Sequence, residues 1–255
     1  MNFHSLLRVE KSRRKAEKFQ TVQDELETMM NSIVNNRNLQ IDKLVKKPNP
    51  DNPVLRIYLG SDLGFCGSVN SYVSKEMQEH GTEGTDRVII GRKIAKEQDS
   101  ALSMEQEELD DRMAEINGLF RKAVEDNCYS AIEVVYNRYC STSQIKQLVY
   151  RIYPLEMESD DTDVTTGDYF VEGNPHRMFT DMLVLYLMTA FRIAAASAYA
   201  SENITRRNVT HESLRKIDER NAEKKRLERK EANRKSFAKT IDNYIKQSFP
   251  GRDGR

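Results

Sequence analysis

The chain has 255 residues, of which 38% are hydrophobic and 31% charged, so it can bury one core but carries too many charges to be globular throughout. Its net charge of zero hides a division: residues 1–48 carry ten basic and six acidic side chains, residues 205–255 carry sixteen and eight, and the centre carries fourteen and twenty-six. The three cysteines, Cys66, Cys128 and Cys140, are odd in number and scattered, which predicts reduced thiols in a cytosolic compartment. The basic ends and the acidic centre are expected to face different partners.

The N-terminal segment is predicted to be one long helix from about Phe3 to Lys47. Its apolar side chains recur at helical spacing and would form a single stripe. The stripe contains Leu6, Val9, Ala16, Phe19, Leu26, Met30 and Ile33. The prolines of KKPNPDNP, residues 46–53, prevent the helix from continuing. The first residues become charged at Arg8 with no apolar run behind them, so no signal peptide is expected.

The central part alternates between short apolar runs and segments of helical spacing. Strands are expected at residues 54–60, 87–91, 131–139 and 145–154, and helices from about residue 69 and over residues 103–127. Strands that alternate with helices predict a small, mostly parallel α/β sheet, with an antiparallel last pair as an option. The acidic, turn-rich stretch from Glu156 to Pro175 is expected to be a loop.

The C-terminal part is predicted to be one very long helix, because no glycine or proline occurs between His176 and Phe249. Its first part, residues 178–200, is apolar nearly all round, as a buried helix requires. Further on, thirteen of the eighteen residues from Asp218 to Lys235 are charged. A thin apolar seam with coiled-coil spacing remains: it includes Leu214, Ile217, Leu227, Ile241 and Ile245.

One apolar stretch approaches the length that a bilayer requires. Residues 182–200 are mostly apolar, and a membrane-spanning helix needs about 20 such residues. Arg192 lies inside the stretch together with Thr189 and Ser197, and a buried core helix accommodates these side chains more easily. The chain is therefore expected to be soluble and not to span a membrane.

Two long helices with narrow apolar seams thus lie at opposite ends of the chain. An antiparallel coiled coil between them is the simplest way to cover both seams. The expected fold class is α/β, with a long antiparallel coiled coil of the N- and C-terminal helices joined to a small α/β domain. The expected division is a coiled-coil helix at 1–48, the α/β domain at 49–175, a second coiled-coil helix at 176–249 and a tail at 250–255.

The sharpest local motif is GSDLGFCGSVNS, from Gly60 to Ser71, between a strand and a helix. Glycines at such a place can bring backbone N–H groups to a phosphate, but the motif lacks the Lys-Ser or Lys-Thr pair and the G-x-G-x-x-G spacing of nucleotide sites. Cys66 could be an activated thiolate at a helix start, yet the sequence indicates no base for it. A tight turn whose glycines serve sheet and helix packing, with a structural thiol, is the preferred interpretation.

The segment SDLGFCGSVNSYVSKEM resembles the Ser-Asp-Arg-Gly-Leu-Cys-Gly-x-x-Asn-Ser segment of the gamma subunit of F-type rotary ATPases, with Leu63 in place of the usual Arg. VVYNRYCSTSQIK is similar to that family's strand and hairpin, and Ser201-Glu202 to the entry of its C-terminal helix. The order of long helix, small Rossmann-like domain and long helix extends the resemblance over nearly the whole chain. The matching family-motif residues are Asp62, Gly64, Cys66, Gly67, Asn70 and Ser71.

The resemblance implies a central-stalk rotor subunit that couples rotation to ATP synthesis or hydrolysis on other subunits. It implies an alpha3beta3-type catalytic ring, an epsilon-type small subunit and a membrane c-type ring as partners, at the cytoplasmic face of a bacterial-type membrane. It implies no catalytic residue, no cofactor and no metal in this chain. Candidate contacts with the ring are four arginines of the C-terminal helix: Arg206, Arg207, Arg226 and Arg229.

The chain departs from that family at helix positions where the shaft would meet the ring. The first helix reads EKFQTVQDELETMM where the family carries Ile-Thr-x-Ala-Met, and NITRRNVTHESL follows Ser201-Glu202 where Arg-Met-x-Ala-Met is expected. These differences indicate a divergent, gamma-like subunit, either of a standard synthase or of an unusual rotary ATPase.

Three other classes of protein remain open. The basic ends suit a nucleic-acid-binding module, but acids interleave with the arginines and no aromatic and basic platform occurs. An enzyme acting alone would need a site, whereas the four histidines are far apart without metal-ligand spacing and no G-x-S-x-G occurs. A coiled-coil adaptor without a rotary function is the third alternative.

Overall fold

A computed structural model describes residues 2–34, 48–80, 84–94, 100–155 and 173–248. The chain divides into two compact units, Met1–Arg207 and Asn208–Arg255, here called the first and the second unit. Three predictions fall partly or wholly outside the described residues: the helix end near Lys47, the loop before Pro175 and the tail at 250–255. The described elements are α1 (Asn2–Val34), β1 (Val54–Leu59), α2 (Gly67–Glu79), β2 (Thr85–Ile90), β3 (Leu102–Met104), α3 (Met113–Glu125), β4 (Ala131–Tyr139), β5 (Ile145–Tyr153) and α4 (Pro175–Ser248).

The first unit contains a five-stranded sheet with the strand order β3-β2-β1-β4-β5. β1 pairs in parallel with β2 and β4, β2 pairs in parallel with β3, and β5 runs antiparallel to β4. The prediction of a mostly parallel sheet, with the optional antiparallel last pair, is therefore confirmed. The central strands are near-continuous apolar runs because helices cover both faces of the sheet.

The predicted helix over residues 103–127 is wrong in its first part. Leu102–Met104 form β3, and α3 starts only at Met113. The Gly91 N–H donates to the Met104 carbonyl oxygen at 3.0 Å, which joins the end of β3 to the segment after β2. A strand of three residues is too short to show alternation in the sequence, so its pairing with β2 decides its conformation.

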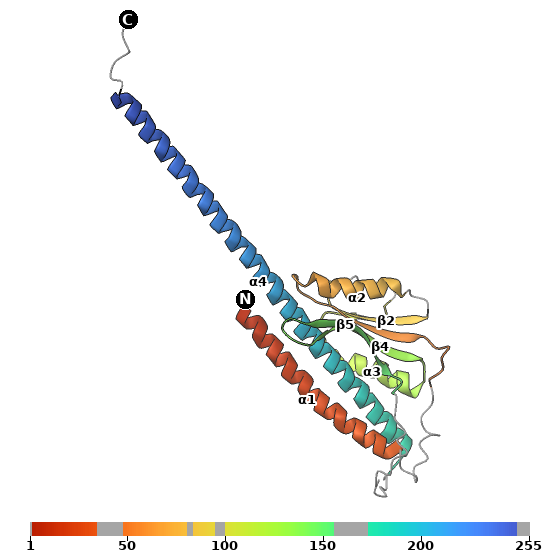
Figure 1. Cartoon of the computed structure of the whole chain (residues 1–255). Coiled ribbons are helices and arrows are strands. Elements are labelled where there is room, and N and C mark those ends of the chain that lie inside the picture. Colours follow the sequence, from red (N-terminus) through yellow and green to blue (C-terminus); the bar gives the residue numbers. More distant parts are fainter. Residues whose placement is uncertain (1, 35–47, 81–83, 95–99, 156–172, 249–255) are drawn as a thin grey trace. The chain divides into compact units, whose positions relative to one another are not determined.

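The sheet of the first unit lies between α2 on one face and α3 with α4 on the other (Figure 1). On the first face, strand side chains pack against Val73 and Met77 of α2. The larger core lies on the second face, where Phe120 of α3 and Phe191 of α4 are both completely buried. Their ring centroids lie 6.1 Å apart with an interplanar angle of 79°, an edge-to-face contact that joins the two helices.

Within the first unit, α1 runs antiparallel to the first part of α4 (Figure 1). Val9 of α1 packs against Ala200 and Ile204 of α4, close to the end of the unit. Further along α1, the ring of Phe19 lies 5.3 Å below the guanidinium of Arg192. Positions that increase along α1 thus meet positions that decrease along α4, and the predicted antiparallel pairing of the terminal helices is confirmed in this part of the chain.

α4 includes an apolar window that is long enough, by length and composition, to cross a membrane. Of that window, 61% is buried inside the protein. Leu187, Ala190 and Ala194 have no exposed surface and belong to the core between α4 and the sheet. The burial agrees with the predicted core helix.

The second unit, taken by itself, continues as helix to Ser248, and each of residues 211–248 is exposed. The apolar seam predicted to be covered in a coiled coil is therefore uncovered: Leu214, Ile217 and Leu227 are 50%, 51% and 59% exposed. The coiled-coil prediction is wrong for this stretch, because among the described residues none buries the seam. Charged pairs one turn apart, such as Glu212 with Lys216 at 2.7 Å, support the helix instead.

Candidate functional site

The family-motif turn after β1 is held together by side chains that bind backbone groups. The Asn70 Oδ1 accepts from the Ser61 N–H at 3.0 Å, and the Asn70 amide nitrogen donates to the Ser61 Oγ at 2.8 Å. The Asp62 carboxylate accepts from the backbone N–H groups of Arg92 (2.8 Å) and Glu107 (3.2 Å). Asp62 therefore ties together the segments that follow β1, β2 and β3, which satisfies polar groups that would otherwise be buried without partners.

Cys66 lies at the start of α2 and is 1% exposed. Its Sγ lies 3.1 Å from the Ser61 Oγ and 3.0 Å from the Leu63 carbonyl oxygen, which can accept the thiol proton. Burial raises the pKa of the Cys66 thiol above its usual value. Both the contacts and the pKa favour the neutral thiol, which is a poor nucleophile.

The glycines of the turn differ in what they contribute. A Cβ atom at Gly64 or Gly67 would meet nothing within 4 Å, so the prediction that these glycines serve close packing is wrong for both. Gly60 is different, because its added Cβ would lie 2.1 Å from the Ile94 side chain. Gly91 has φ +124° and faces the backbone of Gly60, where a Cβ would lie 2.8 Å from the carbonyl carbon. The close approach thus depends on Gly60 and Gly91.

Arg206 joins the same turn to α4. Its Nε donates to the Gly64 carbonyl oxygen at 3.2 Å, and its Nη1 donates to the Asn203 Oδ1 at 3.3 Å. The remaining amino group pairs with the Glu202 carboxylate one turn earlier on α4. Only 15% of the Arg206 side chain is exposed. This arginine is therefore a structural link inside the first unit.

Glu202 is almost completely buried, with 1% of the residue exposed. Burial raises the pKa of its carboxyl group, although the charge of Arg206 opposes the rise. One oxygen, Oε2, makes no hydrogen bond within the described residues. A buried acceptor without a donor is costly, and Glu202 also lines a cavity beside the sheet.

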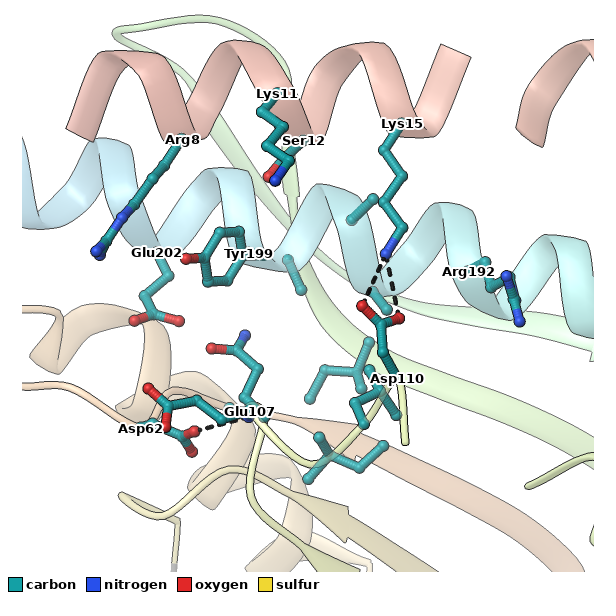
Figure 2. Close-up of a pocket in the computed structure, with 18 of the residues that line it drawn as sticks. Arg8, Lys11, Ser12, Lys15, Asp62, Glu107, Asp110, Arg192, Tyr199 and Glu202 are labelled. Atoms are coloured by element: carbon teal, nitrogen blue, oxygen red, sulfur yellow. Dashed lines mark hydrogen bonds and ion pairs between the residues drawn. The ribbon is translucent and has the colours of Figure 1, made fainter. Parts of the chain in front are cut away.

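That cavity has a volume of about 680 Å³ and lies in the first unit, where the carboxyl ends of β1 and β2 face α1 and α4. Figure 2 shows Lys15 of α1 reaching Asp110, which follows β3, and Tyr199 and Glu202 of α4 lying in the same space. The two ion-pair contacts from the Lys15 Nζ to Asp110 measure 3.2 Å. Ligands of open α/β sheets bind at this edge, outside the carboxyl ends of the strands.

Comparison with known proteins identifies the family. A family model described as ATP synthase matches residues 1–232. The ATP synthase gamma chain of Malacoplasma penetrans is 25% identical over 163 residues, which cover 58% of this chain and 57% of that one. The chain belongs to the ATP synthase gamma-chain family. The gamma chain of Mycoplasma mobile is 24% identical over 75% of this chain and 70% of its own, and that of Glaesserella parasuis is 28% identical over 59% and 58%.

The matches to the first and third of these gamma chains span less than two thirds of the relatives' own lengths. Solved structures that match the chain include the Tetrahymena thermophila mitochondrial ATP synthase central stalk and c-ring, with TM-score 0.49 and 16% identity over 78% of this chain and 99% of that one. The Euglena gracilis mitochondrial ATP synthase has a chain with TM-score 0.46 and 15% identity over 97% and 98%.

The four candidate ring contacts lie in different surroundings. Arg206 is engaged within the first unit, as described above, and Arg207 is half-buried, with its Nε unpaired among the described residues. Arg226 and Arg229 belong to the second unit and are exposed. Of these four arginines, only Arg226 and Arg229 are exposed and thus accessible to a partner.

The cavity brings together groups that the sequence pattern does not predict to meet. Asp62 and Glu202 belong to family motifs, whereas no motif links Arg8, Lys15 and Asp110 to either of them. The signal available was weak: cations spaced three and four residues apart on one face of the first helix. Within the described residues, no group of three or more His, Cys, Asp or Glu side chains could hold a metal ion, so the absence of a metal stays a prediction.

Replacing Glu202 by glutamine is expected to change how the free energy of unfolding depends on pH. The folded-state pKa lies above the unfolded one, so the favourable contribution of the carboxyl is complete at low pH and is lost as pH rises through the folded pKa. The Glu202→Gln chain should therefore gain stability relative to the unaltered chain as the pH rises above the usual pKa range of a glutamate carboxyl. Urea unfolding at several pH values measures this, and a difference that stays constant or reverses with pH would contradict it.

Proposed function

We propose that this chain is the central-stalk rotor subunit of an F-type rotary ATPase or ATP synthase, and that it couples rotation to ATP synthesis or hydrolysis on partner alpha and beta subunits. The observation that carries the proposal is the family match over residues 1–232, which includes α1, the sheet and α4 as far as residue 232. In this role the chain has no catalytic residue of its own, because nucleotide is bound and hydrolysed on the ring.

The surface of the second unit supports the proposal. Its described residues from 211 to 248 are all exposed, and charges of both signs alternate along them. A shaft that turns inside a ring needs contacts that exchange easily, and hydrated charged contacts contribute little binding energy individually. Large apolar contacts would instead hold one orientation.

The partners that fit this role are an alpha3beta3-type catalytic ring, an epsilon-type small subunit and a membrane c-type ring. The chain would then lie peripherally at the cytoplasmic face of a bacterial-type membrane, without spanning it. We assign the roles by segment: the terminal segments 1–48 and 176–249 supply the shaft, the central segment 49–175 faces the small subunit and the c-type ring, and residues 250–255 are a tail.

We further propose that Arg226 and Arg229 contact the ring. The two side chains lie three residues apart on one face of an exposed helix, and an acidic bore would attract them. Arg206 and Arg207, at the end of the first unit, would contribute less because their side chains are largely engaged or half-buried.

Reconstitution with candidate alpha- and beta-type subunits tests the function. The chain should co-elute as one copy per hexamer and raise ATP turnover, and the Arg226→Glu/Arg229→Glu double variant should bind the ring about fivefold more weakly at low salt. A matched control is Arg220→Glu/Lys224→Glu, which reverses the same amount of charge on the opposite helix face.

Two outcomes separate the function from the residue assignment. If the unaltered chain associates with no such ring, the rotor function is wrong. If both charge-reversed pairs weaken binding equally, the function stands but Arg226 and Arg229 are not specific contacts.

A further inference from the structure

The cavity beside the sheet has the size and position of a small-molecule site. Its volume of about 680 Å³ falls in the range of about 300–1,000 Å³ typical of such sites. Leu59 and Gly60 at the end of β1, with Ile90 at the end of β2, form part of its wall. Open α/β sheets bind ligands at this edge, outside the carboxyl ends of the strands. The backbone and side chains at the ends of β1 and β2 therefore face the cavity.

One wall of the cavity is cationic. Arg8, Lys11 and Lys15 project into it from α1, three and four residues apart on one helix face (Figure 2). Lys15 is engaged by Asp110. Within the described residues, neither Arg8 nor Lys11 pairs with a carboxylate, and both line the space. Two unpaired cations on one wall can bind an anionic group through charge-assisted hydrogen bonds.

The opposite wall accepts hydrogen bonds. The Glu202 Oε2 is buried without a donor, and the side chain lies in the cavity in Figure 2. The Asp62 carboxylate lies on the same side, but its two oxygens are already occupied by backbone N–H groups. Glu202 therefore offers one oxygen, Oε2, without a direct hydrogen bond, while Arg206 and the Gln106 side chain interact with the rest of the carboxylate. A hydroxyl or N–H group of a ligand would reduce the cost of burying that oxygen.

The cavity holds charges of both signs. The cations Arg8, Lys11 and Arg192 come from the two long helices, and the carboxylates include Glu202 of α4 and, after β3, Glu107 and Asp110, of which Asp110 is paired with Lys15. Apolar side chains such as Met113 also line the cavity. A complementary ligand must therefore combine an anionic group with hydroxyl or N–H donors. An inorganic anion bound at the cationic wall makes no contact with Glu202.

We propose that this cavity binds a small organic phosphate, with the phosphate against Arg8 and Lys11 and a hydroxyl or N–H group donating to Glu202. The binding does not depend on assembly into a ring, because every lining residue belongs to the first unit. If the chain associates with no ring, the cavity is still expected to bind the organic phosphate. If no ligand binds the cavity, the proposed rotor function is unaffected.

Calorimetry on the full purified chain, without partner subunits, tests the proposal. The probes are ADP, glucose 6-phosphate, inorganic phosphate and adenosine, each at low ionic strength. We expect at least one organic phosphate to bind with one site per chain and to bind about tenfold or more tightly than inorganic phosphate, since the latter makes no contact with Glu202. Binding of neither organic phosphate, or equal binding of inorganic phosphate, overturns the proposal.

Variants show where such a ligand binds. The Arg8→Gln/Lys11→Gln double variant should lose about tenfold or more in affinity, whereas the Arg14→Gln/Lys18→Gln control removes the same charge outside the cavity and should bind normally. Ala195→Met fills the cavity and should abolish binding without removing a charge. Equal loss in the two charge variants would indicate general attraction to a basic helix and would overturn the proposal.

A last variant separates a direct contact from a structural effect. Glu202→Gln should weaken organic phosphates several-fold and leave inorganic phosphate unchanged, while circular dichroism verifies the fold. If Glu202→Gln weakens both probes equally, the carboxylate does not contact the ligand and the assignment is wrong. Because the α1 double variant changes exposed residues, its result remains decisive even if Glu202→Gln destabilises the chain.

Discussion

Replacing Leu227 by proline is expected to remove most of the chain's ability to raise ATP turnover by a reconstituted ring. Leu227 lies in the middle of the second unit's helix and is 59% exposed. Proline inside a helix removes a backbone hydrogen bond and clashes with the preceding turn, at a cost of about 3 kcal/mol. Because no described residue buries this stretch, nothing there offsets the break, and the helix beyond it would lose its alignment.

The matched control is Leu227→Ala, which removes the same exposed side chain but keeps a strong helix former. It should retain nearly full activation. Thermal unfolding of the first unit's core should be unchanged in both variants, since Leu227 is not part of that unit. Full activation by Leu227→Pro would show that an intact helix in the second unit is not required and would count against the rotor function.

Phe120→Ala is expected to cause the largest loss of stability, about 3–5 kcal/mol in the free energy of unfolding. The Phe120 side chain of α3 is completely buried and meets the edge or face of Phe191 of α4 at a centroid distance of 6.1 Å. Its removal leaves a cavity between two helices that both pack on the sheet, where close-packed neighbours relax only partly. Urea unfolding monitored by circular dichroism measures the change.

The aromatic contact itself can be separated from burial. Phe120→Leu keeps most of the buried volume and should cost clearly less than Phe120→Ala. Combining Phe120→Leu with Phe191→Leu in a double-mutant cycle should give a coupling of about 0.5–1.5 kcal/mol. A loss below about 1 kcal/mol for Phe120→Ala would mean that the α3–α4 contact is not a main part of the core.

The strands that could be predicted from the sequence are those with a strong local pattern. VLRIYL and AIEVVYNRY are apolar runs bounded by turn residues, and their predicted positions agree with β1 and β4. β3 could not be predicted, because three residues carry no periodicity and the segment becomes a strand only by pairing with β2. The start of α3 was misplaced for the same reason.

The candidate site shows the same contrast. The motif turn after β1 was recognised from its residues, but the partners of Asp62 lie 30 and 45 positions further along the chain. The need for glycine at Gly60 and Gly91 arises only where two segments approach within van der Waals contact. Neither the Arg206 link to the turn nor the unpaired Glu202 oxygen has a local signature, since each depends on which helix lies against the loop.

The amino-acid sequence by itself determined the elements: two terminal helices, an alternating α/β centre, and the family to which the motif turn belongs. Local periodicity is sufficient for this because hydrogen bonding within a helix, and the apolar runs of buried strands, are properties of neighbouring residues. Only the tertiary structure decided which part of the apolar seam on α4 is covered and which charges line one cavity. Those features depend on contacts between residues far apart in the chain, and such contacts form only when the packed sheet and helices bring them together.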